Sequence, residues 1–411
     1  MSRNKTMAKI DRFLSILMIA LFSCLAAIAQ PREGIWRGTL DMQGMQLPFN
    51  FEMKLEDNIW RVYLLNAEER LLIRDSKVKQ DSIYLPMNLF DSYIVAAFQG
   101  DHLEGVFVKN YSEDYKETFK ADYGLEYRFF PDSDEPVTDF SGRWAINFTS
   151  EDDSITSIGL FKQEANRIWG TILTATGDFR YLQGNVKGKN LYLSTFDGAH
   201  DFIFQASLLG PGKLVGLWLY GKNYKEGWSA TKDASAEIPD FTNVAYSKKD
   251  QPFEFSLKGL DGRTITHNDP ALKGKPILLQ IFGTWCSNSM DLSNFIDDWL
   301  RAHPGTGFEW VGLSFETRDD LPYARERLEN WRTFMESDAK LAFGGKADKA
   351  SASMVFPTLS RVNAYPTLII LDKDHKPVRT YGFFNGPATE EYYEVFKEDF
   401  EAVVQSVLEN R

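Results

Sequence analysis

Apolar and polar residues alternate in short runs over the first half of the chain, and this alternation predicts β-strands. The runs are separated by polar or glycine-containing turns, as in FNFEMKL, WRVYLLN and SYIVAAF. We count about eight candidate strands in each of two successive stretches and no convincing amphipathic helix. Sequential antiparallel strands close into a small barrel or pack as a sandwich. We therefore expect two antiparallel β domains, each a barrel or a sandwich.

The pattern changes after Phe253, where strands begin to alternate with helices. Residues 276–282 form a continuous apolar run, which is typical of a central strand covered on both faces. A helix with an apolar face follows at once. The remaining runs predict a strand, a helix, a short strand, a hairpin and a final helix, over residues 308–315, 320–337, 341–343, 368–383 and 389–408. This order predicts a layered α/β domain.

The two β stretches repeat each other at a constant offset. GIWRGTL at Gly34 parallels GRWAINF at Gly142, and YKETFKA at Tyr115 parallels YKEGWSA at Tyr224. These partners lie 108 or 109 residues apart, as do two further pairs of landmarks. A fixed period indicates an internal duplication. We interpret the repeated tryptophans as core residues, because buried aromatic rings dominate core packing: Trp36 with Trp144, and Trp60 with Trp169.

Two polar stretches divide the chain. Residues 131–139 contain two prolines and are typical of a linker, and residues 232–251 separate the β pattern from the α/β pattern. We therefore expect β repeat 1 over 30–130, β repeat 2 over 140–235, and the α/β domain over 252–411.

The N-terminus resembles an export signal. Four basic residues precede an apolar run from Phe13 to Ala29, which ends in Ala27-Ile28-Ala29, a small-x-small cleavage pattern. We expect residues 1–29 to be a signal peptide and the protein to be exported, most simply to a bacterial periplasm. Two alternatives stay open, an uncleaved membrane anchor and a lipoprotein processed at Cys24. Membrane association is expected only in these two situations.

Charge and composition exclude some functions. The net charge is −12, and it becomes −15 without residues 1–29, so broad nucleic-acid binding is not expected. The five histidines are scattered and none is paired at ligand spacing, so we expect no metal site. We also expect no cofactor.

Removal of residues 1–29 leaves one cysteine, Cys286, at a strand–helix junction. An internal disulfide is then impossible. Unpaired N–H groups and the dipole at a helix start stabilise a thiolate, which predicts a lowered pKa and a nucleophile near neutral pH. A buried and inert cysteine is the plainer alternative.

The last 159 residues resemble the TlpA/ResA-like group of exported thioredoxin-fold thiol–disulfide oxidoreductases. Trp285-Cys286-Ser287-Asn288-Ser289 lies where that family has Trp-Cys-x-x-Cys, and Tyr365-Pro366-Thr367 looks like its cis-proline segment. The turn from Gly382 to Pro387 and the entry hairpin after Phe253 also fit. The resemblance implies a thioredoxin-like fold, with Cys286 as nucleophile and Trp285, Tyr365, Pro366 and Thr367 beside the substrate.

Ser289 departs from the family, because it replaces the second, resolving cysteine. A dithiol enzyme releases its mixed disulfide by attack of that second thiol, and Ser289 can only donate a hydrogen bond to the Cys286 thiolate. Monothiol (Cys-x-x-Ser) chemistry with a protein or a small thiol or disulfide remains possible. We favour such an oxidoreductase, with the repeats recruiting partners or substrate. The alternative is a redox-inactive binding or scaffold protein. Glu316 could be a nearby acid or base, although a solvated strand end is the simpler interpretation.

Overall fold

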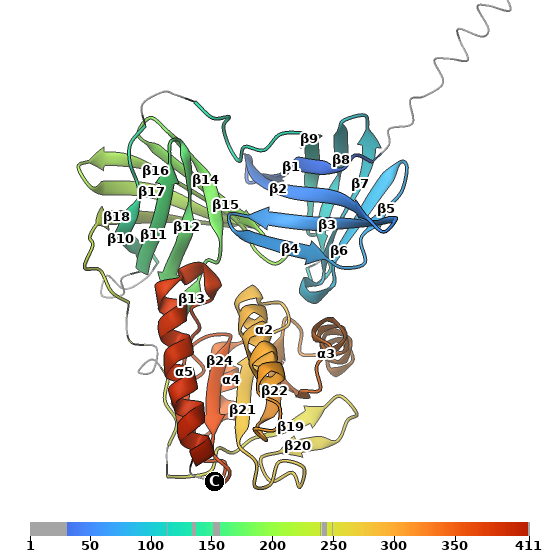
Figure 1. The fold of residues 1–411 in the computed structure, drawn as a ribbon, viewed down its shortest axis with the longest axis vertical. Coiled ribbons are helices and arrows are strands. Elements are labelled where there is room, and N and C mark those ends of the chain that lie inside the picture. Colours follow the sequence, from blue (N-terminus) through green and yellow to red (C-terminus); the bar gives the residue numbers. More distant parts are fainter. Residues whose placement is uncertain are drawn as a thin grey trace, which may run out of the picture.

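The computed structural model describes residues 31–112, 114–133, 137–150, 157–238, 240, 245–248 and 250–409. The predicted signal peptide and Cys24 lie outside these residues. No helix within the described ranges is long and apolar enough to span a membrane. The fold is mostly β, with two β units side by side above an α/β region (Figure 1).

The first β unit is an open antiparallel sheet that curves into a half-barrel. Its strand order is β4-β3-β2-β1-β9-β8-β7-β6-β5, and a short 3-10 helix, η1 (Asn88–Phe90), follows β6. The strands are β1 (Gly34–Met42), β2 (Met45–Glu56), β3 (Ile59–Asn66), β4 (Glu69–Ile73), β5 (Lys77–Val78), β6 (Ser82–Met87), β7 (Ser92–Gln99), β8 (His102–Lys109) and β9 (Lys116–Tyr123).

The second β unit is a closed eight-stranded barrel, because β12 pairs with both β11 and β14. The short strand β13 lies beside β12, outside the ring of eight strands. The strands are β10 (Gly142–Phe148), β11 (Ser157–Glu164), β12 (Arg167–Thr174), β13 (Gly177–Asp178), β14 (Leu182–Lys187), β15 (Asn190–Phe196), β16 (Asp201–Gly210), β17 (Lys213–Tyr220) and β18 (Tyr224–Lys232).

The two β units follow the same strand order but differ at one edge. In the first unit the free edge of β3 is filled by the five-residue β4, and β5 pairs only with β6, so the sheet stays open. In the second unit β13 has only two residues, and β12 reaches β14 directly. The expectation of a barrel or sandwich is correct for the second unit and wrong for the first, which is an open half-barrel. The duplication itself stays a prediction.

The α/β region contains a mixed seven-stranded sheet in the order β20-β19-β23-β22-β21-β24-β25. Strands β21, β22 and β23 run parallel to one another, and β24 is antiparallel to β21. The strands are β19 (Ser256–Gly259), β20 (Thr264–Thr266), β21 (Ile277–Phe282), β22 (Glu309–Glu316), β23 (Lys340–Lys346), β24 (Thr367–Leu371) and β25 (Pro377–Tyr381). The predicted strands and helices of this region are present, and α4 (Lys349–Val355) is an additional helix.

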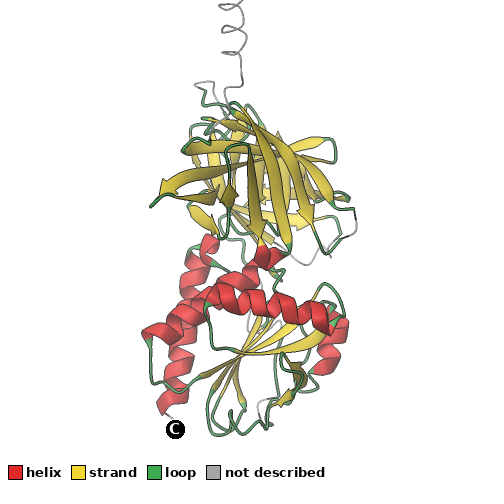
Figure 2. Ribbon diagram, turned by 90° about the vertical axis from the view of Figure 1, so that its right-hand side faces the viewer, coloured by secondary structure: helices red, strands yellow, loops and turns green. Residues whose placement is uncertain are grey.

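Helices cover both faces of the mixed sheet (Figure 2). The long helices α2 (Ser287–Ala302), α3 (Leu321–Met335) and α5 (Glu391–Glu409) pack on the face to which Leu278 and Phe282 point. Helix α4 packs on the opposite face, with Ile277, Leu279 and Ile281. Alternate residues of β21 therefore enter two different cores, as expected for a central strand buried on both sides.

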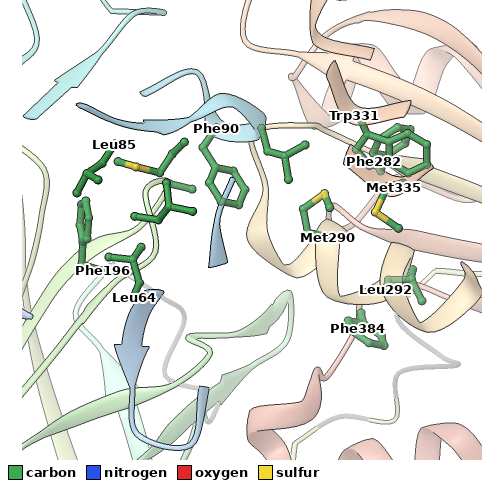
Figure 3. Packing of buried hydrophobic residues seen from close by; sticks show 14 of the residues in the cluster. Leu64, Leu85, Phe90, Phe196, Phe282, Met290, Leu292, Trp331, Met335 and Phe384 are labelled. Atoms are coloured by element: carbon green, nitrogen blue, oxygen red, sulfur yellow. The ribbon is translucent and has the colours of Figure 1, made fainter. Parts of the chain in front are cut away.

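The half-barrel shares its core with the α/β region. One continuous apolar cluster runs from Trp36 and Leu64 of the half-barrel to Met290 and Trp331 of the helices, part of which Figure 3 shows. The barrel instead encloses a separate core around Trp144. Trp36 and Trp144 are both buried, as predicted, whereas Trp60 and Trp169 are half-buried.

Candidate functional site

Cys286 lies at the junction between β21 and α2, where the sequence predicts it. It is the N-cap residue of α2, and its backbone N–H donates to the carbonyl of Gly283 at 3.1 Å. A side chain at Gly283 would collide with the indole of Trp285, which donates from Nε1 to the carbonyl of Phe315 at 2.9 Å. Gly283 therefore allows the tight turn that places the cysteine at the helix start.

The predicted proline loop lies directly beside the thiol. The Tyr365–Pro366 peptide bond is cis, and Cys286 Sγ donates a hydrogen bond to the carbonyl of Tyr365 at 3.3 Å. The ring of Trp285 meets that of Tyr365 edge-on, with centroids 5.7 Å apart. Two motifs separated by 79 positions thus meet at one sulfur atom.

The other predicted site residues are close by but buried. Ser289 is fully buried near Cys286, and its hydroxyl has no hydrogen-bond partner within the described residues. Thr367 is also fully buried at the start of β24, where its hydroxyl donates to the carbonyl of Ala364 at 2.9 Å. Tyr365 is 8% exposed, and Trp285 is half-buried.

Glu316 is not the solvated strand end that the sequence suggests. Its side chain is buried at the end of β22, and its carboxylate accepts from the backbone N–H and the hydroxyl of Thr284, at 3.2 and 2.8 Å, and from Ser314. Burial raises the pKa of Glu316, and these hydrogen bonds oppose that shift. Through Thr284, Glu316 holds the turn two residues before the cysteine.

A short segment of the barrel, residues 175–180 between β12 and β14, covers the site. It contacts the first turn of α2 and the segments that contain Asn363 and Gly386. Asn288 Nδ2 donates to the carbonyl of Asp178 at 3.1 Å, and Asn363 Nδ2 donates to that of Ala175 at 2.9 Å. The backbone N–H of Gly386 donates to Asp178 Oδ2 at 2.7 Å. Cys286 is only 6% exposed.

This cover changes the expected chemistry of the thiol. Burial raises the pKa of Cys286, and the nearby Ser289 hydroxyl and the N–H groups of Asn288 and Ser289, which act to lower it, do not reverse the shift. The predicted lowering of the pKa is therefore wrong for this conformation. The helix start does stabilise the thiolate, but loss of water around the sulfur outweighs that effect.

A buried ion cluster lies next to the cover and links all three units. Arg180 of the barrel binds Asp291 of α2 through Nε and Nη2, at 2.8 and 2.9 Å. It also binds Glu69 of β4 at 2.6 Å and Asp197 at 2.8 Å. Sequence reasoning missed these residues, because a charged side chain far from any motif carries no sign of burial. Within the described residues, no group of three or more His, Cys, Asp and Glu side chains could hold a metal ion.

Some solved structures are similar to part of this chain. No family model matches the chain, and no curated protein matches it in sequence. A thiol:disulfide interchange protein of the thioredoxin family from Chlorobium tepidum is 17% identical, with a TM-score of 0.28, over 38% of this chain and 94% of that one. A secreted thiol-disulfide isomerase from Corynebacterium glutamicum is 20% identical, with a TM-score of 0.30, over 42% and 96%.

A DsbF homologue from Corynebacterium diphtheriae is also 20% identical, with a TM-score of 0.27, over 40% of this chain and 97% of that one. Similar structures are thus thioredoxin-family thiol–disulfide proteins that match less than half of this chain.

Proposed function

We propose that this is an exported, thioredoxin-like protein of the bacterial periplasm that exchanges thiols and disulfides through one cysteine, Cys286. The observation that carries the proposal is the position of Sγ, at a helix start and 3.3 Å from the carbonyl beside cis-Pro366. The Ser289 hydroxyl lies nearby and has no partner within the described residues. The carbonyl orients the thiol, and the N–H groups at the helix start favour the thiolate once water reaches the sulfur, which supports attack on a disulfide.

The exchange follows from the single thiol. The Cys286 thiolate attacks one sulfur of a client disulfide, the client S–S bond breaks, and the other client sulfur leaves as a thiolate that takes up a proton. The product is a mixed disulfide between Cys286 and the client. Ser289 cannot resolve it, so the mixed disulfide persists until an external thiol attacks. The protein would therefore capture clients for longer than a dithiol enzyme does.

A redox-inactive scaffold is the second candidate, and one observation favours it. Cys286 is 6% exposed, and burial raises its pKa. In this conformation no client could reach the sulfur. The two candidates differ in whether residues 175–180 move away from the α/β region.

Alkylation of Cys286 tests the proposal. The double variant Asn288→Ala, Asn363→Ala removes two hydrogen bonds that hold the cover. We expect iodoacetamide to modify native Cys286 slowly and to modify the double variant at least tenfold faster. Water can reach the sulfur in the variant, and the pKa of the thiol therefore falls. Mass spectrometry measures the rate, with Cys286→Ala as the blank. Arg167→Ala, on the exposed barrel surface, is the matched control and should leave the rate unchanged.

An equally slow rate in the folded double variant would favour the scaffold. A second variant, Ser289→Cys, tests competence directly. It places a second thiol at the position of the Ser289 hydroxyl, so disulfide reduction should appear when the cover is also loosened. Absence of reduction in the folded triple variant would contradict thiol exchange at this site.

A further inference from the structure

A cavity of about 360 Å³ lies where the open edge of the half-barrel meets α2 and α3. The half-barrel contributes β3, β4 and the turn from Pro86 to Phe90, and the barrel contributes Arg180 and Asp197. Figure 3 shows Phe90 of the half-barrel and Met290 of α2 on facing sides of this region. The volume is within the range of small-molecule pockets, at its lower end.

The walls of the cavity are apolar side chains already withdrawn from water. Leu64, Ile73, Met87, Phe90 and Met290 all line it, and each is buried. The cavity exists because β4 and β5 do not pair, so no strand closes the half-barrel beneath the helices. Such a space favours a ligand with an apolar body, because burial of its surface is favourable.

One end of the cavity is polar and carries an excess of negative charge. Arg180, Asp197 and Asp291 line this end, and Glu69 also binds Arg180, so one guanidinium faces three carboxylates, of which Asp197 also contacts the His200 ring at 3.1 Å. Burial raises the pKa of Glu69 and of Asp291, and the charge of Arg180 opposes but does not reverse these shifts. A further cation here would offset the excess, whereas an anion would be repelled.

A second, independent observation points to a ligand at the same end. Ser287 lines the cavity and is fully buried, yet its Oγ has no hydrogen-bond partner in the described part of the chain. Buried hydroxyl groups are almost always paired, because an unpaired one costs free energy. A ligand atom that donates a hydrogen bond would satisfy Ser287 Oγ beside the carboxylates.

The opposite end of the cavity opens at the surface. Arg74, just after β4, lies over the ring of Phe334 in α3, with its Cζ 4.3 Å from the ring centroid. Arg74 also approaches Glu336 at 3.9 Å, and both side chains are largely exposed. An exposed pair of this kind is weak, so it can open to admit a ligand.

From these features we propose that the cavity binds a small cationic amphiphile, a primary amine with a short alkyl or aromatic body. The ammonium group lies at the Ser287, Asp197 and Asp291 end, where it donates hydrogen bonds, and the apolar body lies against Leu64, Phe90 and Met290. This site does not use the Cys286 thiol, so it is independent of the proposed function.

Three probes of equal chain length test the proposal: n-octylamine, 1-octanol and octanoate at pH 7, each titrated into the full chain by calorimetry. We expect octylamine to bind tightest, octanol next, and octanoate at least tenfold more weakly than octylamine. Hexylamine should bind about tenfold more weakly than octylamine, because it buries two fewer methylene groups. Equal binding of octanoate and octylamine, or no binding of octylamine, would overturn the proposal.

Variants locate the binding site. Leu71→Trp fills the cavity from β4 and should abolish octylamine binding, whereas Leu209→Trp, at a side chain 74% exposed on β16, should not alter it. Cys286→Ala should also bind normally. Unchanged affinity in the folded Leu71→Trp variant would place the amine elsewhere and contradict the site.

The variant Asp291→Asn removes one negative charge from the cavity and keeps the shape of the side chain. We expect the preference for octylamine over octanol to fall at least threefold in this variant, with octanol affinity retained as evidence of an intact cavity. Ser287→Ala should weaken both probes by a similar factor, because each donates to Oγ. A preference for octylamine that survives Asp291→Asn in the folded protein would contradict the role of the carboxylates.

Discussion

The half-barrel and the barrel follow the same strand order, but they bury their apolar residues differently. The barrel closes when β12 meets β14, and its core around Trp144 is its own. The half-barrel remains open beyond β4, and its core continues into α2 and α3. One edge pairing therefore separates a β unit that encloses its own core from one whose core continues into a neighbour.

The open edge has two consequences for the rest of the molecule. It leaves the cavity in which we place a ligand, and it ties the half-barrel to the helix that begins at Cys286. The closed barrel contributes in another way, through the Arg180 cluster and residues 175–180 over the thiol. The predictions below test this division between a self-contained barrel and a dependent half-barrel.

Arg180→Ala should have the largest effect. It leaves Glu69, Asp197 and Asp291 without their common cation in a buried place, which costs about 3–5 kcal/mol of the free energy of unfolding. Urea unfolding followed by fluorescence measures the change. Arg167→Ala, which breaks an exposed pair with Asp132 on the same barrel, is the control and should cost at most about 1 kcal/mol. Similar small losses for both arginines would refute a role of Arg180 in joining the units.

Replacing the equivalent tryptophans of the two units should destabilise different parts of the molecule. Trp36→Ala and Trp144→Ala should each cost about 3–5 kcal/mol, because both indoles are buried. Hydrogen exchange should then differ. We expect faster exchange in the half-barrel and in α2 and α3 after Trp36→Ala, because they share one core, but mainly in the barrel after Trp144→Ala. Identical exchange patterns would mean that the half-barrel is as self-contained as the barrel.

A smaller effect is expected from a polar contact between the two β units, in which the Tyr115 hydroxyl of the half-barrel hydrogen-bonds Glu117 at 3.1 Å and Asp201 of the barrel at 2.6 Å. Burial raises the pKa of Glu117 to about 7, further assisted by the charge of Asp201. A carboxyl group whose pKa is raised on folding binds its proton more tightly in the folded state. Stability from Glu117 is therefore present below about pH 4.5 and is lost as the pH rises through about 7.

Glu117→Gln keeps the shape of the side chain and cannot ionise. We expect the native protein to lose more of its free energy of unfolding than Glu117→Gln does between pH 5 and pH 8, as measured by urea unfolding at each pH. Other acids contribute equally to both proteins and cancel in the difference. Parallel pH profiles for the two proteins would show that Glu117 does not titrate in this range.

Much of the fold could be predicted because local patterns fix local elements. The apolar run ending at Phe282 had to be a central strand, and the Trp-Cys and Tyr-Pro motifs bracketed the thiol. The edge pairing of β12 with β14 could not be predicted, because it depends on whether β13 or β14 fills the edge of β12, and the sequence pattern does not decide between them.

The proximity of the candidate site residues could be predicted from the sequence, but their environment could not. Cys286, Ser289 and Pro366 do meet, yet the pKa of the thiol depends on burial by residues 175–180, which lie in another unit. Burial of Glu316 and Arg180 likewise arises from tertiary contacts. No periodicity along the chain encodes which loop will lie over a distant helix start.

The position of the cover in the chain has a consequence for biosynthesis. Asp178 precedes Asn288 by 110 positions, and every strand of the barrel comes before β19. Chains emerge from the ribosome N-terminus first, and N-terminal domains generally fold first. A chain that folds in this order completes the cover before the cysteine takes its place at the helix start. The thiol then folds against a lid that already exists, which shields it from stray disulfide formation while the rest of the molecule matures.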